Sequence, residues 1–317
     1  MPKLSPFQSR SALQNRADLA FRGITVFCAT VLIIIMLAIF FELVRNSGLS
    51  IKKFGLGFLL SMAWNPVTQN FGALTSIFGT VVSTIIAMII AVPLSIITAL
   101  FLVELAPPIL SRIVGIGVEL LAAVPSIIYG MWGLFVFAPF MADHIQPALG
   151  KTLGFLPLFQ GPPMGIGMLS AGIILALMII PFICAVTRDV FQMVPAAVKE
   201  AGFGMGSTTW EVTRKVTIRY GFRGVIGACF LGLGRAVGET MAVTFVIGND
   251  HRISASLFSA GNSIASTLAN EFAEAAEPIY LSSLIELGLV LFLITFLIQI
   301  FAQLWLRRIA KGMGDRL

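Results

Sequence analysis

The chain has 317 residues, of which 57% are hydrophobic and only 11% are charged, and its mean hydropathy is +0.96. A soluble domain usually has about 25% charged residues, so this composition excludes a soluble globular protein and indicates an integral membrane protein. The net charge of +6 does not indicate nucleic-acid binding, because the basic residues flank apolar runs and form no patch with aromatic residues.

Six apolar segments are long enough to cross a bilayer, for which a helix needs roughly 20 mostly apolar residues. In chain order they cover residues 24–44, 72–104, 112–138, 165–187, 222–247 and 281–306. The first lacks a small-residue cleavage site and is expected to remain as an uncleaved span. The sequence therefore predicts an all-α integral membrane protein with six transmembrane helices.

The positions of the basic residues predict the orientation. If the N-terminus is cytoplasmic, the inner segments hold 15 of the 21 basic residues and the outer loops hold five, as the positive-inside rule requires. Both termini are therefore expected in the cytoplasm. The resulting organisation is a cytoplasmic tail at 1–23, a first transmembrane helix with its outer loop at 24–71, a main transmembrane domain at 72–306 and a cytoplasmic tail at 307–317.

The outer loop 248–280 contains one short periodic stretch. Ile264, Leu268 and Phe272 recur every four residues after Asn262, a candidate N-cap, so a short amphipathic helix is expected there.

No catalytic or metal-binding set is visible. His144 and His251 fall in the outer loops 139–164 and 248–280 without a partner cluster, so they are expected to be surface residues. The cysteines lie inside apolar runs without metal-ligand spacing and are expected to be packing residues: Cys28, Cys184 and Cys229. The chain is therefore not expected to be an enzyme, and no metal or cofactor is expected in it.

The inner loop 194–224 reads VPAAVKEAGFGMGSTTWEVTRKVTIRYGFRG and is the polar island of the chain. Its glycines permit a tight turn, and Ser207, Thr208 or Thr209 could cap a second helix, so two short helices at a glycine bend are expected. One interpretation is a solvated loop of membrane-surface helices. The apolar residues between the glycines favour the other interpretation, a docking surface for a protein partner.

The stretch LGLGRAVGETMAVTF, residues 231–245, places Arg235 and Glu239 four residues apart in a predicted span. Each charge costs about 2.5–3.5 kcal/mol at the centre of a membrane helix, so the two residues indicate either a polar substrate pathway or an ion pair that fastens the bundle. Glu119 and Glu286, in the third and sixth spans, are further candidates that could line the pathway, pair with Arg235 or a partner subunit, or stay protonated. Glu104 lies near a span end, where it can reach the membrane interface.

The order of residues in the inner loop resembles the motif of ABC-importer permeases, whose loop docks on a cytoplasmic ATPase. The matching residues are Glu200, Ala201, Gly206, Val216, Ile218 and Gly224. Gly202 stands where the family usually has a second alanine, and Arg219 stands where it usually has a proline. The resemblance implies that Glu200, Ala201 and Gly206 couple this chain to the ATPase.

Five further segments between residues 72 and 306 resemble the PstC-type permeases of bacterial phosphate importers. They are PLSIITALFLVELAP (93–107), VELLAAVPSIIYGMWGLF (118–135), GPPMGIGMLSAGIILALMIIP (161–181), GRAVGETMAV (234–243) and GNSIASTLANEFAEA (261–275). The resemblance implies a six-helix permease of the bacterial inner (plasma) membrane that moves inorganic phosphate from the periplasm to the cytoplasm. It also points to Arg235 and Glu239 as important for transport.

The same resemblance implies a set of partners. These are a homologous second permease (PstA type), two copies of a cytoplasmic ATPase (PstB type) that bind ATP and Mg²⁺, and a periplasmic phosphate-binding protein (PstS type). Three alternatives remain open at this point: an ABC permease for another oxyanion such as molybdate, sulfate or phosphonate, a secondary transporter or channel that acts alone, and a membrane component of phosphate signalling.

Overall fold

The computed structural model describes residues 6–314, and within them the chain is all-α apart from its connecting turns and loops. Six helical stretches are long and apolar enough to cross a membrane: Ala17–Asn46, Leu74–Leu105, Ser126–Leu153, Met168–Gln192, Thr209–Val237 and Pro278–Arg308. The predicted all-α fold with six spans is therefore confirmed. Two of the spans, the third and the fifth, differ in their course from the sequence prediction.

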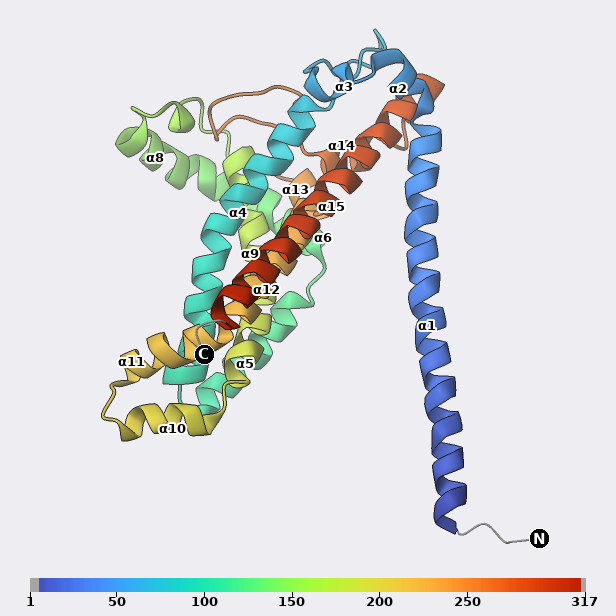
Figure 1. Cartoon of the computed structure of the whole chain (residues 1–317). Helices are drawn as coiled ribbons and strands as arrows, with labels where there is room; N and C mark the ends of the chain where they lie inside the picture. The colour runs from blue at the N-terminus through green and yellow to red at the C-terminus, as the bar shows by residue number, and fades with distance from the viewer. Residues whose placement is uncertain (1–5, 315–317) are drawn as a thin grey trace, which may run out of the picture.

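The first helix, α1 (Pro6–Asn46), stands apart from the other helices along most of its length (Figure 1). Between Leu19 and Val44 most of its apolar side chains are exposed, as expected for a helix surrounded by lipid or by another protein. The short helices α2 (Gly48–Phe54) and α3 (Gly57–Leu60) follow it. The backbone N–H of Ser50 in α2 donates to Ser282 Oγ at 3.1 Å, which ties this segment to the last helix, α15 (Pro278–Gly314).

The centre of the bundle is the packing of α4 (Leu74–Leu100) along α9 (Met168–Gln192), with α12 (Ile218–Val237) beside them. Small residues let these helices approach closely. A Cβ added at Gly172 of α9 would lie 2.6 Å from the side chain of Ile86 in α4. Membrane helices use such contacts because van der Waals packing, and not water exclusion, holds them together.

The third predicted span, 112–138, is broken in the structure. Helix α5 (Pro108–Ala122) ends before Pro125, and α6 (Ser126–Trp132) begins after it. Proline disfavours the α conformation of the residue before it and lacks an N–H, so the helix stops there. After α6 the chain stays helical much further than predicted, through the π turns Gly133–Phe137 and Met141–Ile145 and the helices α7 (Ala138–Phe140) and α8 (Gln146–Leu153).

The predicted outer loop 139–164 was therefore wrong in its first half, which is helical. The proline and glycine content of this segment suggested a loop, but its first half also carries a polar residue that is bonded inside the protein. Gln146 is buried, and its Oε1 accepts a hydrogen bond of 2.9 Å from the backbone N–H of Gly165. The chain becomes irregular only after Leu153, where it includes a short 3₁₀ turn at Pro157–Phe159.

The fifth predicted span, 222–247, is also wrong at both ends. The helical stretch begins with α11 (Thr209–Val212) and a π turn at Thr213–Thr217, which lead directly into α12. Helix α12 then ends at Val237, and only the single turn of α13 (Met241–Thr244) follows. Gly238 occupies the C-cap of α12 with φ −91°, so the helix ends there without the left-handed glycine turn that is common at helix C-termini.

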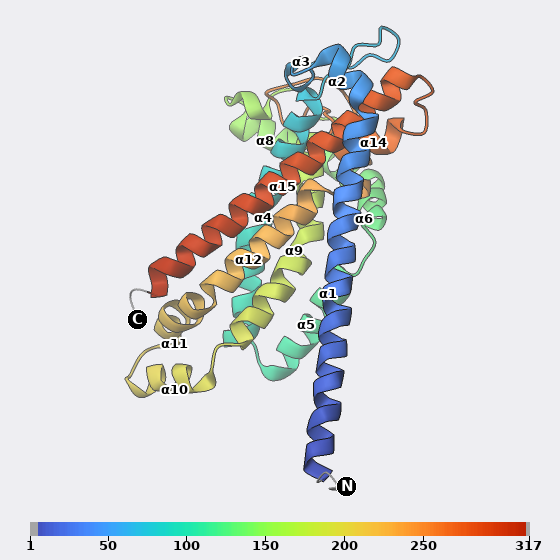
Figure 2. The same cartoon turned by 45° about the vertical axis from the view of Figure 1, so that its right-hand side comes forward.

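The two ends of the bundle carry different parts of the chain. One end holds both ends of the described chain together with α10 (Ala196–Gly204) and α11, and we call it the terminal end (Figures 1 and 2). The opposite end, the far end, holds α2, α3, α8 and α14 (Ile264–Glu271). The described ends of the chain and the loop 194–224 thus lie at the same end of the bundle.

Candidate transport pathway and coupling loop

The end of α12 separates the two charges of the fifth span. Arg235 lies in the last turn of the helix and is exposed, whereas Glu239 follows Gly238 in a non-helical segment and is half-buried. Among the ion pairs of the described residues, none joins Arg235 to Glu239. The alternative of an ion pair along one face of a continuous helix is therefore not found among the described residues, because α12 ends between the two charges.

The two side chains have different surroundings. The guanidinium carbon of Arg235 lies 5.6 Å from the ring centroid of Phe182 on α9, a cation–π contact. Glu239 Oε1 instead accepts a hydrogen bond of 3.3 Å from the backbone N–H of Ala242, at the start of α13. Glu239 thus stabilises the turn that follows the helix break, and the Arg235 side chain remains at the surface of the bundle.

Glycines place the helix break against its neighbours. A Cβ added at Gly130 of α6 would lie 2.7 Å from the side chain of Phe245, and one added at Gly133 would lie 2.9 Å from Val246. Val246 is fully buried. Irregular backbone is tolerated at membrane depth only where protein or a water-filled cavity surrounds it. Here the third span packs closely against the irregular segment and shields part of it from lipid.

The break in the third span borders a groove of about 490 Å³ between α6 and α9. Its lining is almost entirely apolar and consists of Leu121, Val124, Ile128, Tyr129, Trp132, Leu177, Ile180 and Pro181. Pro181 precedes Phe182, which carries the Arg235 contact. The groove residue Pro181 and the Arg235 contact residue Phe182 are thus adjacent on α9, which the sequence did not predict.

The structure does not bring Glu119 or Glu286 to Arg235. Glu119 Oε1 pairs with Arg188 Nη1 at 3.1 Å. Glu286 is buried on α15, and its Oε2 has no hydrogen-bond partner among the described residues. On the same helix, Gln299 packs against Gly234, the residue before Arg235. Glu286 lies 13 residues before Gln299, which at 1.5 Å per residue places it roughly 20 Å away along α15.

The loop 194–224 contains the predicted short helix and glycine bend, but the second helix is not short, because it continues into α12. Helix α10 ends in a turn where Gly206 has φ +80°, and Thr208 then caps α11. The Thr208 hydroxyl accepts from the Glu211 N–H at 3.3 Å and the Glu211 carboxylate accepts from the Thr208 N–H at 3.0 Å, a capping box. Gly202 has a local reason too, because a Cβ there would lie 3.1 Å from Val212.

Several apolar side chains of this loop are exposed, and no other described segment of the chain packs over them. The exposed side chains are Val198, Phe203, Met205 and Trp210, with Met205 83% exposed. Exposed apolar patches of this kind mark protein interaction sites, which favours the docking interpretation over a solvated loop.

Glu200 and Ala201 are exposed on the same loop. Among the described residues, the Glu200 side chain makes no hydrogen bond or ion pair. The neighbouring Lys199 makes such a contact instead, with its Nζ 2.7 Å from Glu104 Oε1. The sequence missed this pair, since Glu104 was expected to reach the membrane interface.

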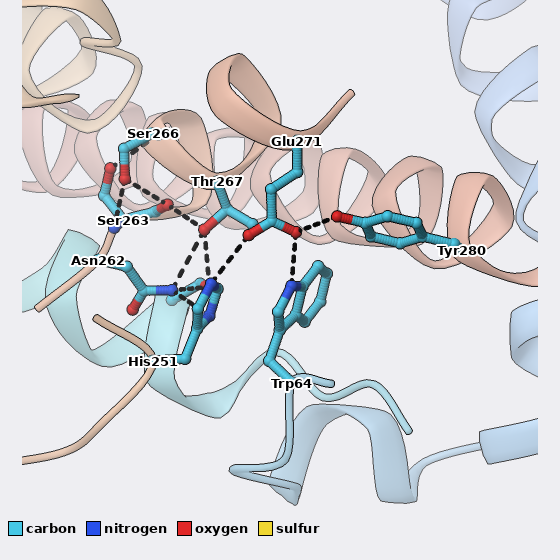
Figure 3. Close-up of polar contacts among 9 residues, drawn as sticks. Trp64, His251, Asn262, Ser263, Ser266, Thr267, Glu271 and Tyr280 are labelled. Carbon is cyan, nitrogen blue, oxygen red and sulfur yellow. Dashed lines mark hydrogen bonds and ion pairs between the residues drawn. The ribbon is translucent and has the colours of Figure 1, made fainter. Parts of the chain in front are cut away.

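A polar cluster ties together the far end of the bundle (Figure 3). Glu271 accepts hydrogen bonds of 2.6 Å from Trp64 Nε1 and from the Tyr280 hydroxyl, and its other oxygen lies 3.0 Å from His251 Nε2. The His251 ring stacks on Trp64 with centroids 5.3 Å apart, and its Nδ1 lies 2.8 Å from Asn262 Nδ2. His251 is therefore not the isolated surface residue that was expected.

The helix predicted in the loop 248–280 is confirmed as α14, but its N-cap differs. Ser263 caps it by accepting from the Ser266 N–H at 3.0 Å. Asn262, the expected cap, is buried and donates to Ser76 Oγ at 2.8 Å. The Asn262 amide nitrogen thus reaches a residue 186 positions away, a partner that no local sequence pattern reveals.

The surroundings of Glu271 set its pKa. Burial alone would raise the pKa of this carboxyl, but the hydrogen bonds from His251, Tyr280 and Trp64 outweigh burial and hold the pKa below its usual range. Because the folded value is lower than the unfolded one, the ionised carboxylate stabilises the cluster fully above the usual glutamate pKa of about 4.3 and progressively less as pH falls through the folded value. No change from this group is expected between pH 6 and 8.

We therefore expect Glu271→Gln to loosen α14 at neutral pH. The change removes the negative charge from three hydrogen bonds, and a hydrogen bond to a charged group contributes about 1.5–3 kcal/mol. Amide hydrogen exchange of residues 264–271 at pH 7 should accelerate in the variant. The matched control is Glu274→Gln, an exposed glutamate in the same loop, which should exchange as the wild type does. Equal protection in both variants would contradict the role of Glu271.

Comparison with known proteins agrees with this architecture. Residues 91–311 match the family described as "Binding-protein-dependent transport system inner membrane component". The chain is 51% identical over 313 residues to the "Phosphate transport system permease protein PstC" of Mesorhizobium japonicum, with 96% of each chain covered. It is 52% identical over 303 residues to the protein of the same name from Pasteurella multocida, with 94% of each covered.

More distant similarity supports the same fold. The chain is 36% identical over 289 residues to the "Probable phosphate transport system permease protein PstC" of Methanocaldococcus jannaschii, covering 89% of this chain and 90% of that protein. A solved structure of the MetNI methionine ABC transporter in an inward-facing conformation superposes with a TM-score of 0.52 at 20% identity, covering 75% of this chain and 94% of that one.

A permease of this family is the non-catalytic, multi-pass membrane subunit of an ABC importer, and the ATPase and the binding protein are its separate partners. The chain therefore belongs to the family of binding-protein-dependent transport system inner membrane components and, within it, to the PstC-type permeases.

Proposed function

We propose that this chain forms part of the pathway that carries inorganic phosphate from the periplasm to the cytoplasm in an ATP-driven importer. The observation that carries this proposal is Arg235, which is exposed beside a helix break and takes part in no ion pair among the described residues. A guanidinium offers forked donors that match the geometry of phosphate oxygens. The names of the PstC relatives support phosphate as the anion.

The exposure of Arg235 calls for a second subunit. A charged residue at a membrane helix centre costs about 2.5–3.5 kcal/mol, so lipid is a poor neighbour for it. We assign this face to a homologous permease of the PstA type, so that the anion passes between the two chains. Glu239 lies in the adjoining break and keeps phosphate from binding too tightly to leave, because conduction requires weak sites.

The terminal end is assigned to the cytoplasm, as the excess of basic residues on that side supports. There the loop 194–224 docks on one of two copies of a PstB-type ATPase, which bind ATP and Mg²⁺, through its exposed apolar residues and through Glu200, Ala201 and Gly206. The far end then faces a phosphate-binding protein of the PstS type. Glu271 is not a free docking charge, because the polar cluster engages it.

Uptake by the purified complex in proteoliposomes tests this assignment. With ATP inside and the binding protein outside, we expect uptake of labelled phosphate that arsenate competes and that molybdate and sulfate do not. Uptake of molybdate, sulfate or a phosphonate in place of phosphate would identify a permease for another oxyanion. Transport by this chain alone would contradict the importer assignment, and signalling activity without any transport would favour a membrane component of phosphate signalling.

A further inference from the structure

One carboxylate, just after the C-terminus of α4, joins three segments of the chain. Glu104 lies in the π turn Phe101–Leu105, which continues α4. Its Oε1 accepts a hydrogen bond of 2.7 Å from Lys199 Nζ in α10 and another of 2.7 Å from the Thr217 hydroxyl at the start of α12. A single atom thus connects the loop helix to two membrane-spanning helices.

The contact is shielded from water. The Glu104 side chain is 8% exposed and that of Lys199 is 19% exposed, while Thr217 is fully buried. Ion pairs on open surfaces contribute little, because water and salt screen them. Separating a shielded pair leaves an unpaired charge in a low-dielectric environment, so this pair resists separation far more than a surface pair does.

Helix α10 has few other polar connections to the bundle. Among the described residues, Lys199 makes its only side-chain hydrogen bond or ion pair to a membrane-spanning helix. The apolar packing of α10 is on α11 and on the π turn Thr213–Thr217, where a Cβ added at Gly202 would lie 3.1 Å from Val212 and 4.0 Å from Val216. The polar connection from α10 to α4 therefore runs through Lys199 and Glu104.

Both membrane-helix partners of this contact lie in π turns. Glu104 belongs to the turn Phe101–Leu105 and Thr217 to the turn Thr213–Thr217. Such turns interrupt the regular hydrogen-bond ladder of a helix and occur frequently at functional sites. The junction thus joins helices at points where their backbones depart from regular α geometry.

We infer that Glu104 is a positioning residue of the coupling mechanism, which makes α4 and α12 follow α10 when the ATPase moves it. This inference rests on the proposed function, because it requires that the loop 194–224 docks on the ATPase. It adds a residue outside the loop motif and a defined route from the loop into the helix bundle.

The test measures phosphate uptake and ATP hydrolysis in the same proteoliposomes, using the complete complex. Glu104→Gln should lower the phosphate imported per ATP hydrolysed by about 2- to 30-fold, the range that single residues in a coupling network contribute. Lys199→Met should act similarly. Because Lys199 lies in α10 and not in a membrane-spanning helix, this variant keeps the test valid if Glu104→Gln fails to fold. The matched control is Glu42→Gln on α1, an exposed glutamate, which should leave the ratio unchanged.

The charge exchange Glu104→Lys with Lys199→Glu should recover most of the ratio, because the Thr217 hydroxyl can accept from a lysine as well as donate to a carboxylate. A purely structural contact would instead lower the amount of complex recovered and leave phosphate per ATP unchanged, which would overturn the inference.

Gly206→Val distinguishes failure of this inference from failure of the proposed docking of the loop 194–224. If it uncouples the complex and the Glu104 and Lys199 variants do not, the inference fails and the docking loop stands. If none of them uncouples, the docking assignment itself fails.

Discussion

Replacing Arg235 with glutamine is expected to abolish phosphate uptake while the complex still assembles in the membrane at its normal level. Glutamine keeps hydrogen-bonding capacity on a shorter side chain and removes the charge that we propose receives the anion. The fold should survive, because Arg235 is exposed and its cation–π contact with Phe182 contributes only about 0.5–1 kcal/mol. The measurement is labelled-phosphate uptake, normalised to the amount of purified complex.

Three companion variants separate charge, shape and position. Arg235→Lys keeps the charge but loses the forked donors, so uptake should be reduced and still measurable. Arg112→Gln removes an exposed arginine at the terminal end and should transport normally. The exchange Arg235→Glu with Glu239→Arg should not restore uptake, because it moves the positive charge into the half-buried segment before α13. Near-normal uptake by Arg235→Gln would contradict the pathway assignment.

The number of spans and their approximate positions could be predicted from the sequence, because hydropathy over about 20 residues is a strong signal. The interruptions could not be predicted with the same certainty. Pro125 lies in a continuous apolar stretch, and prolines also occur inside unbroken helices, as Pro93 does in α4 and Pro181 in α9. Whether a helix breaks at proline depends on which neighbours satisfy the freed carbonyl, which is a tertiary property.

The candidate site shows the same division between local and distant information. The capped second helix and the bend at Gly206 follow from residues a few positions apart, and the sequence predicted them. The contact of Lys199 with Glu104 spans 95 residues and that of Trp64 with Glu271 spans 207, so no local pattern reveals either one. An ion pair of Arg235 with Glu239 was one alternative because a continuous helix was expected, and the end of α12 at Val237 removes that basis.

Replacing Gly206 with valine is expected to uncouple ATP hydrolysis from phosphate uptake without removing the protein from the membrane. Gly206 has φ +80°, a conformation that costs a non-glycine residue on the order of 1–3 kcal/mol and that is least favourable for a β-branched one. The bend between α10 and α11 should therefore distort and displace the docking face. We expect continued ATP hydrolysis with uptake near background, measured in the same proteoliposomes.

The physical cause of that uncoupling can be resolved with asparagine at the same position. No atom lies within 4 Å of a Cβ added at Gly206, so crowding within this chain does not explain the glycine. Asparagine adopts left-handed backbone conformations more readily than most residues, so Gly206→Asn should preserve the bend while adding a side chain to the exposed surface. Normal coupling in Gly206→Asn would show that the backbone conformation is what the loop requires. Loss of coupling in both variants would show that the ATPase approaches too closely for any side chain, and normal coupling in Gly206→Val would contradict the docking role of the loop.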